Sequence, residues 1–211
     1  MKSRISNFGL LKADQSFTLV ELITVMAIIL LLVSLLLPAM SYARIQARKY
    51  VARQDMTNLQ NALLGFRQEY GYFPAPTTWQ DLSTTLNGNV NAFTGVSASS
   101  GSFASNNNPK AIRFMEFKTN QVNSSGEFLD PWGTKYMVLM DNGGAAVGKA
   151  GWSDLSNGGA SGPEDGMVSH PRTTATNLQT QVAIYSCGQN VTDDSADQTY
   201  YDDISSWNEQ P

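Results

Sequence analysis

Cysteine and histidine are almost absent from this chain of 211 residues, which contains only Cys187 and His170. A single cysteine excludes an intrachain disulfide, so core packing, a partner or a metal has to stabilise the fold. A zinc site with several histidines is excluded, and a Ser-His-Asp arrangement would depend on His170 alone, which we place in a surface loop. We expect Cys187 to fill a small space at a strand end. No constellation of catalytic residue types stands out, and the chain is predicted not to be an enzyme.

Basic residues are scarce in the later part of the chain. From residue 54 onward there are 7 basic and 16 acidic residues, a net charge of −9, which argues against nucleic acid as a ligand. The other basic residues form two groups: Lys2, Arg4 and Lys12 near the N-terminus, and Arg44, Arg48, Lys49 and Arg53 further on. We interpret the second group as a solvated or lipid-facing collar, because long basic side chains near the end of a membrane span reach headgroup phosphates.

Residues 17–40 lack charge apart from Glu21 and are predominantly apolar. As a helix, this stretch measures about 36 Å, which is enough to cross a hydrocarbon core of about 30 Å. A cleaved secretory signal would have an apolar stretch of only about 7 to 15 residues, and Ala39-Met40-Ser41 fits its cleavage site poorly. We therefore predict a single membrane span whose N-terminus stays in the cytoplasm, because the residues before it carry positive charge.

The helical pattern resumes beyond Pro38, which is expected to kink the helix or melt one turn because its ring removes a hydrogen bond. An apolar stripe follows at spacings of three and four residues: Met56, Leu59, Leu63, Phe66 and Tyr70. Gly71 and Pro74 predict the end of the helix just after this stripe. The membrane span and the stripe are thus predicted to form one helix of about 50 residues.

Shorter elements follow the long helix. Thr78, with Asp81 three residues later, predicts the cap of a short helix that carries Trp79, Leu82 and Leu86 on one face. Residues 87–108 are rich in Asn, Ser and Gly and are predicted to be a mobile surface loop. Asn108-Pro109 is expected to start a further helical turn.

The last part of the chain contains the signals of a sheet. Asp130-Pro131-Trp132-Gly133 fits a type I turn. Residues 136–140 and 182–185 are predicted to be two buried, paired strands. The connection between them, residues 141–181, is unusually long for a compact domain and indicates a functional or disordered excursion.

The stretch Ser16-Phe17-Thr18-Leu19-Val20-Glu21-Leu22, followed by the apolar run, resembles the processing signature of type IV pilins and of the pseudopilins of type II secretion systems. The resemblance implies that a membrane aspartyl prepilin peptidase cuts between Ser16 and Phe17 and that the new Phe17 amine is methylated. It also implies that Glu21 neutralises the terminal amine of a neighbouring subunit in a helical fibre. Pro38 stands where the family has a helix-interior proline, whereas Ser16 replaces the usual glycine, so slower processing is expected.

The charge of Glu21 is itself informative about its role. A charged group inside a membrane helix costs roughly 2.5 to 3.5 kcal/mol, so it is expected to have a partner and a use. Phe17 and Glu21 are one helical turn apart, and an amine at Phe17 would be largely cationic at neutral pH. The alternative is an interfacial carboxylate that merely extends toward water.

The C-terminal half resembles the major pseudopilin through Tyr72-Phe73-Pro74, Asp130-Pro131-Trp132-Gly133, Ile184-Tyr185-Ser186-Cys187-Gly188 and Asp202-Asp203-Ile204-Ser205-Ser206-Trp207. In that family a bound calcium closes the C-terminal loop, whereas many type IV pilins use a disulfide there. The resemblance implies Asp202 and Asp203 as calcium ligands, with help from Ser186, Gly188 and Asn190. Asn190 stands where the family tends to have Asp, and the alternative is a solvated acidic loop with no metal.

These observations predict an α+β fold in which a long helix packs on a small antiparallel sheet with long loops. The expected organisation is a leader (1–16), a transmembrane half-helix (17–40), an amphipathic half-helix (41–71) and a periplasmic globular region (72–211). The resemblance implies a pseudopilus subunit in the bacterial inner membrane. Its partners would be other copies of itself in a homopolymer, the prepilin peptidase, minor pseudopilins, and the inner-membrane platform and ATPase. The alternatives are a type IV pilin for adhesion, motility or DNA uptake, and a membrane-tethered periplasmic binding module.

Overall fold

The computed structural model describes residues 17–74, 76, 78–141, 168–169, 177–190 and 203–207. The chain divides into two compact units, Met1–Arg44 and Ile45–Pro211. The predicted leader, residues 1–16, lies outside the described residues, as does most of the long connection over 141–181.

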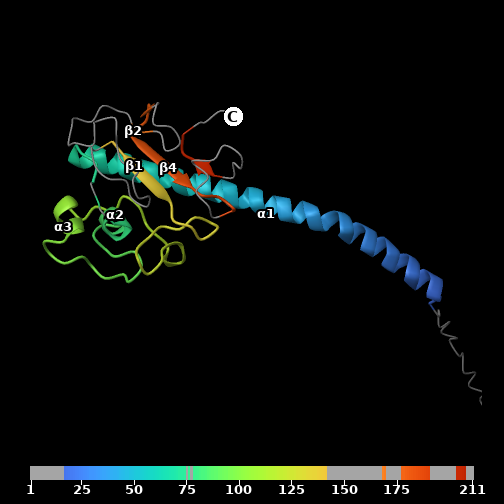
Figure 1. Cartoon of the computed structure of the whole chain (residues 1–211). Coiled ribbons are helices and arrows are strands. Elements are labelled where there is room, and N and C mark those ends of the chain that lie inside the picture. The colour runs from blue at the N-terminus through green and yellow to red at the C-terminus, as the bar shows by residue number, and fades with distance from the viewer. Residues whose placement is uncertain are drawn as a thin grey trace, which may run out of the picture. The chain divides into compact units, whose positions relative to one another are not determined.

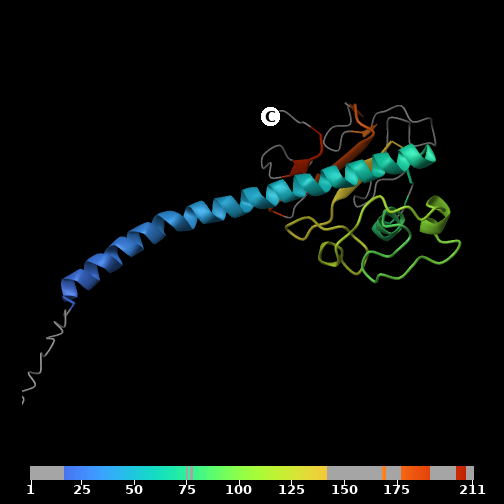
Figure 2. The same ribbon diagram turned by 180° about the vertical axis from the view of Figure 1, so that it is seen from behind.

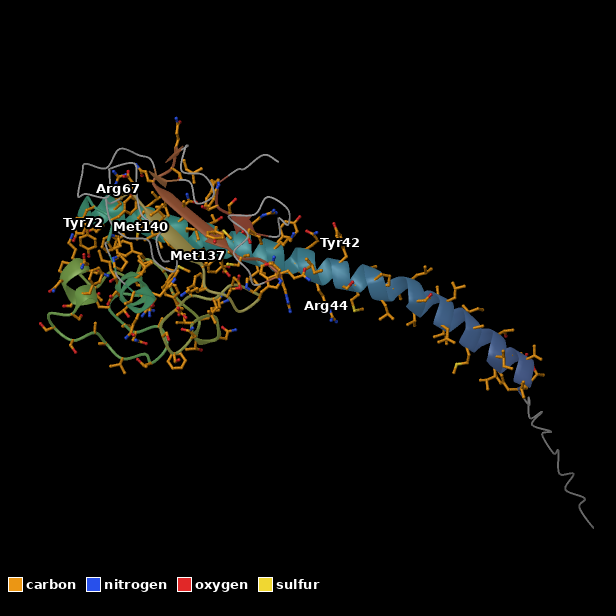
Figure 3. All side chains as sticks on the ribbon, in the orientation of Figure 1. Tyr42, Arg44, Arg67, Tyr72, Met137 and Met140 are labelled. Carbon is orange, nitrogen blue, oxygen red and sulfur yellow. The ribbon has the colours of Figure 1, made fainter. Side chains whose placement is uncertain are left out.

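One helix, α1 (Leu19–Tyr70), contains both predicted half-helices. Its N-terminal part is long and apolar enough to cross a membrane, and its most apolar window has no buried residue. Figure 3 shows side chains projecting on all sides of this part of the helix. Leucine, isoleucine and valine side chains exposed all round a helix need an apolar surrounding, because a soluble helix is apolar on one face only.

Of the two outcomes expected at Pro38, a kink or a melted turn, the melted turn does not occur. The helix continues through Pro38 without interruption. Proline removes one intrahelical hydrogen bond, and the bonds of the turns on either side are retained. The carbonyl that loses its donor is that of Ser34, four residues before the proline. The Pro38 carbonyl itself accepts a 2.8 Å hydrogen bond from the Ser41 hydroxyl.

The second half of α1 carries the predicted apolar stripe. Met56, Leu59, Leu63 and Phe66 are fully buried, which confirms the helical spacing of the pattern. Burying each of these side chains contributes about 1.5 to 3 kcal/mol. The helix ends as predicted, because Gly71 has a positive φ of 81° and its N–H donates to the Arg67 carbonyl at 2.7 Å.

The main sheet is antiparallel and has the order β1-β4-β5, formed by Met137–Met140, Val182–Ser186 and Ile204–Ser205. Met140 pairs with Val182 and Met137 with Tyr185, which confirms the two predicted strands. A separate two-stranded sheet pairs β2 (Val168–Ser169) with β3 (Asn177–Leu178). Figures 1 and 2 show β1 and β4 beside the C-terminal half of α1 in opposite views, and the Gln60 amide donates to the Val182 carbonyl at 3.5 Å.

Both faces of the β1–β4 pair are buried. One face belongs to the main core with α1 and includes Val138, Met140, Val182 and Ile184. The other face forms a second cluster, composed of Met137, Leu139, Ala183, Tyr185 and Cys187, against which Leu178 and Trp207 pack. Cys187 is buried in this cluster at the end of β4, in agreement with the packing role expected for it.

The short helix α2 (Trp79–Leu86) begins at the predicted cap. The Thr78 hydroxyl accepts from the Asp81 N–H at 3.1 Å and donates to the Asp81 carboxylate at 2.8 Å. Trp79, Leu82 and Leu86 are buried. The Trp79 indole donates a 3.0 Å hydrogen bond to the Tyr136 carbonyl and so ties α2 to the start of β1.

The segment after α2 differs from the sequence prediction. It contains α3 (Phe103–Asn107) and an antiparallel bridge between Val90 and Ser97, and a 3₁₀ turn, Thr119–Gln121, follows it. No helix starts at Asn108, which instead caps the end of α3. Periodicity could not show this, because the segment is organised by polar contacts rather than by an apolar stripe.

Asn108 is the fully buried residue around which this segment is arranged. Its side-chain carbonyl accepts from the Tyr70 hydroxyl at 2.5 Å and from the Ile112 N–H at 3.0 Å. Its amide group donates to the carbonyls of Thr85 and Ile112, each at 2.8 Å. The amide thus uses its full hydrogen-bonding capacity and connects α1, α2 and the following segment.

Asp55 is a buried carboxylate on the core-facing side of α1. It accepts hydrogen bonds from the Tyr136 hydroxyl at 3.3 Å and from the Gln121 amide at 3.5 Å. Burial raises the pKa of Asp55 above its usual range, and the bonds from Tyr136 and Gln121 and the charge of Lys118 offset part of this rise. The ionised form is therefore disfavoured in the folded state.

This raised pKa predicts a pH-dependent stability. The folded state binds more protons than the unfolded state between the ordinary aspartate pKa of about 3.9 and the raised value, so stability falls as pH increases through that window. We expect Asp55→Asn to remove this component from the thermal midpoint of the full chain in detergent, measured from acid to neutral pH. Glu116→Gln, an exposed acidic control, should keep the wild-type slope, and an unchanged slope in Asp55→Asn would contradict the assignment.

Candidate functional site

Glu21 lies in the first turn of α1, where it forms a reciprocal cap with Thr18. The Glu21 carboxylate accepts from the Thr18 N–H at 2.9 Å and from the Thr18 hydroxyl at 2.7 Å. The Glu21 N–H in turn donates to the Thr18 hydroxyl oxygen at 3.3 Å. Two backbone donors of the first turn thus have partners, and the carboxylate also lies at the positive end of the helix dipole.

This cap is a contact that the sequence reasoning missed. Threonine followed three residues later by glutamate, ahead of an apolar run, is the capping-box pattern, and Thr18 and Glu21 fit it. In the uncut chain the nitrogen of Phe17 is a peptide amide, so a cationic amine is not available there. The carboxylate is therefore held by its own helix, and it is exposed.

Phe17 and Pro38 lie within the described residues. Ser16, on the leader side of the predicted cut, lies outside the described residues. Phe17 is not helical and is 80% exposed, so the bond that precedes it adjoins an accessible side chain. Pro38 lies inside α1.

A second candidate site lies where β4 ends and β5 begins. Ile204 pairs with Ser186, so Asp203, the residue before β5, lies beside the end of β4. Both carboxylate oxygens of Asp203 are shielded from solvent. Gly188, buried with a φ of 68°, turns the chain away from β4, and Asn190 is exposed two residues later. The structure thus brings Ser186, Gly188 and Asp203 to one end of the sheet, while Asp202 lies outside the described residues.

Asp130 is the buried carboxylate that organises this end of the sheet, a role that the sequence reasoning missed. One of its oxygens accepts from the N–H groups of Trp132 and Thr134, each at 2.9 Å. The other accepts from the Ser186 hydroxyl at 2.6 Å. The Gly133 N–H also donates to the Asp130 carbonyl at 3.0 Å, which confirms the predicted turn.

Ser186 links Asp130 to the turn that follows β4. Its hydroxyl oxygen accepts from the Gly188 N–H at 3.1 Å while its proton is donated to Asp130. The chain Gly188 to Ser186 to Asp130 therefore fixes the backbone that leaves β4 against the Asp130–Gly133 turn. No periodic pattern indicates this link, because the two residues are 56 positions apart in the chain.

Some of the oxygen atoms at this end of the sheet are of the kinds that bind calcium. Calcium takes about six to eight oxygen ligands, and Asp203 supplies a shielded carboxylate to which peptide carbonyls could add. The Ser186 hydroxyl has a single unused lone pair because its other positions are engaged. Across the described ranges, no three His, Cys, Asp or Glu side chains lie close enough together to hold a metal.

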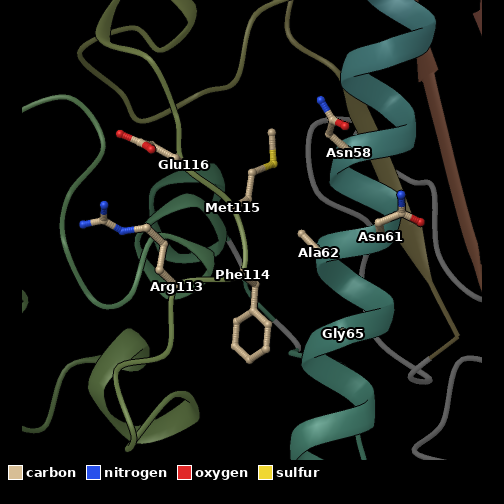
Figure 4. Close-up of a pocket in the computed structure, with 8 residues that line it drawn as sticks. All are labelled: Asn58, Asn61, Ala62, Gly65, Arg113, Phe114, Met115 and Glu116. Carbon is tan, nitrogen blue, oxygen red and sulfur yellow. The ribbon is translucent and has the colours of Figure 1, made fainter.

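A groove of about 540 Å³ lies between α1 and the segment that follows Asn108. Figure 4 shows Asn58, Asn61, Ala62 and Gly65 on the helix side, facing a strip of chain from residue 113 to residue 116. The helix approaches this strip closely at Gly65, where an added Cβ would lie 3.6 Å from the Phe114 ring. The lining combines amide, apolar and charged side chains and contains no histidine or cysteine.

Comparisons with known proteins found no match to a protein-family model, to a curated protein or to a solved structure.

The Asp130–Ser186 contact predicts large losses of stability. Asp130→Ala leaves two backbone N–H groups and one hydroxyl without their acceptor in a buried site, and each such group costs about 1 to 3 kcal/mol. We expect the free energy of unfolding to fall by about 3 kcal/mol or more in Asp130→Ala. Ser186→Ala leaves one Asp130 oxygen and the Gly188 N–H without a partner and should cost about 2 kcal/mol or more. Urea denaturation of the full chain in detergent measures both losses.

A double-mutant cycle tests the contact itself. Asp130→Asn combined with Ser186→Ala should cost less than the sum of the two single changes, because both remove the same hydrogen bond. Strict additivity would show that the two side chains do not interact.

Proposed function

We propose that this chain is the subunit of a helical fibre, anchored in a membrane by α1 and assembled after cleavage between Ser16 and Phe17. We further propose that the fibre is the pseudopilus of a type II secretion system, which supports protein export. A single observation carries the proposal: α1 is apolar on all sides over its first half and holds one carboxylate, Glu21, in its first turn.

The exposed apolar surface supports the proposal because it has to be covered. Within the part of the chain that the structure describes, the most apolar window of α1 is not buried at all. Lipid covers such a helix before assembly, and other copies of the same helix can cover it in a fibre. A surface that is equally apolar on all sides suits both surroundings, whereas a helix that packs on one partner would need only one apolar face.

The geometry of Glu21 suggests how processing and assembly are linked. In the uncut chain the carboxylate bonds to Thr18 at 2.7 and 2.9 Å, and no cationic amine lies in its turn. Cleavage would create an amine at Phe17, and a charge paired with an amine of a neighbouring copy is far less costly in an apolar surrounding than an isolated one. Thr18 would then hold Glu21 in position until that partner arrives.

The choice between a secretion fibre and a type IV pilus depends on the C-terminal end of the chain. The helix would serve both fibres equally well. Cys187 is buried in an apolar cluster and is the only cysteine, so a disulfide-closed loop of the pilin kind is excluded. We propose that Asp203, Asp202, Gly188 and Asn190, with Ser186, hold a calcium ion that closes the loop instead.

The assembly role of Glu21 is tested by substitution. We expect Glu21→Leu to insert into membranes as the wild type does, because it removes the cost of a buried charge, and to form no fibres. Ser34→Leu, which replaces a polar side chain in the same apolar half, is the matched control and should assemble normally. Fibre formation is followed by shearing and electron microscopy, and the mass of the mature N-terminus shows whether Ser16–Phe17 is cut in each variant.

A second variant separates the cap from the charge partner. Thr18→Ala removes the capping hydroxyl but keeps the carboxylate, so it should assemble more weakly than the wild type but better than Glu21→Leu. Normal fibres from Glu21→Leu would falsify the proposed role and would favour a membrane-tethered binding module.

Calcium is tested by its effect on stability. A ligand that binds only the folded state at about 100 times its Kd stabilises by about 2.7 kcal/mol. We expect a chelator to lower the thermal midpoint of the full chain in detergent and added calcium to restore it. Asp203→Asn should abolish this response, whereas Glu69→Gln, a carboxylate paired with Lys110, should leave it intact. An unchanged midpoint on chelation in the wild type would remove calcium from the proposal.

A further inference from the structure

Tyr42 and Arg44 lie just beyond the apolar part of α1 and take no part in the fold described above. Both belong to the first compact unit, Met1–Arg44. Tyr42 is 65% exposed, and Arg44 is exposed as well. The two residues are about 200° apart around the helix, and Figure 3 shows their side chains on different sides of α1. Within the part of the chain that the structure describes, no ion pair includes Arg44.

The Arg44 side chain is directed back along the helix. Its guanidinium donates a 3.5 Å hydrogen bond to the sulfur of Met40, one turn nearer the N-terminus. Helical side chains prefer this direction, because the Cα–Cβ bonds of a helix tilt toward its N-terminus. A thioether is only a weak acceptor, and a guanidinium has five N–H donors, so most of them are left for another acceptor.

The position of this charge along the helix matches the headgroup layer of a bilayer. When Phe17 lies at the inner edge of a hydrocarbon core of about 30 Å, the outer edge falls near residue 37. The guanidinium, at the level of Met40, then lies about 4 to 5 Å beyond that edge, within a headgroup layer of about 5 to 8 Å. This layer contains phosphate groups, which arginine binds with two parallel hydrogen bonds, and tyrosine rings are enriched there.

The apolar run does not fix its own depth in the membrane. Residues 17–40 measure about 36 Å as a helix, so about 6 Å of the run exceeds the core and the helix can shift along its axis by that amount. Glu21 lies about 6 Å inside the core when Phe17 is at the inner edge. The cost of its charge there favours a shift toward the cytoplasm. A contact at the outer surface of the membrane would oppose this shift.

We propose that Tyr42 and Arg44 anchor α1 to the headgroups of the outer leaflet, where Arg44 binds lipid phosphate and Tyr42 holds another side of the helix at the same interface. This inference rests on the proposed membrane anchorage of α1. The anchor keeps Glu21 about one helical turn inside the core and Phe17 at its cytoplasmic edge. It deepens the proposed function, because it sets the depth at which cleavage before Phe17 takes place.

The test measures the depth of a nitroxide label in the uncut full chain, reconstituted into phosphatidylcholine vesicles. The label is attached to Leu36→Cys in a Cys187→Ala background, because Leu36 is 61% exposed. Its depth follows from its collision rates with oxygen, which concentrates in the core, and with a water-soluble nickel chelate. We expect Tyr42→Ala combined with Arg44→Gln to move the label about 3 to 6 Å deeper, and each single change to give part of this shift. An unchanged depth would overturn the inference.

The matched control is Arg48→Gln, which removes an exposed cation one turn further along the same helix. The Arg48 charge lies about 10 Å beyond the core edge, past the headgroup layer, so this variant should keep the wild-type depth. Arg44→Lys should keep it too, because a lysine at this position still reaches phosphate. A shift in Arg48→Gln equal to that in Arg44→Gln would show that cationic charge in general sets the depth, and would contradict the assignment.

Vesicles without phosphate identify the lipid group that Arg44 binds. In digalactosyldiacylglycerol with the same acyl chains, Arg44→Gln should no longer move the label, whereas Tyr42→Ala should act as it does in phosphatidylcholine. An equal shift of Arg44→Gln in both lipids would overturn phosphate as its partner. A wild-type label that collides freely with the nickel chelate would show that α1 does not insert, and the proposed membrane anchorage would then fail. Insertion at a depth that is independent of Tyr42 and Arg44 overturns only the present inference.

Discussion

The rest of the structure depends on the burial of one stripe of α1. Four side chains on this stripe, from Met56 to Phe66, are fully buried and face the β1–β4 strands and α2. Cys187 is the only cysteine, so no disulfide within the chain can stabilise the fold, and apolar packing against this stripe stabilises it instead. Asp55, on the same side of the helix, accepts a hydrogen bond from Tyr136. Because burial raises the pKa of Asp55, its contribution to stability depends on pH.

Two buried polar side chains connect segments that the apolar stripe does not hold together. Asn108 joins the end of α1 to α2, and Asp130 joins its own turn to the end of β4. Each is buried and bonds to specific backbone groups and to one hydroxyl, so each fixes a geometry that apolar packing alone would leave adjustable. The loop proposed to hold calcium emerges from the point that Asp130 and Ser186 hold in place.

The two ends of α1 serve different purposes in the proposed fibre. The first half is apolar on all sides, so it has no face that would select one apolar partner over another. Glu21 adds a carboxylate in its first turn. The second half buries its apolar stripe in the core of the globular region, so its specific contacts lie within the chain. In the proposed fibre, the apolar half would supply contacts of low specificity, and the pairing of Glu21 with an amine of a neighbouring copy would supply a specific one.

Periodicity in the sequence was enough to locate α1, α2 and the β1–β4 pair, because repeats of 3.6 and 2 residues and the Thr78 cap are local properties of the chain. Local patterns did not predict the structure where a residue bonds to a partner far away in the sequence. Nothing near Asn108 shows that its amide is buried under Tyr70, so a helix start was expected where a helix ends. Residue types identified Asp130 as a turn former, but only the tertiary structure placed Ser186 against its carboxylate, because long-range contacts leave no periodic trace in either segment.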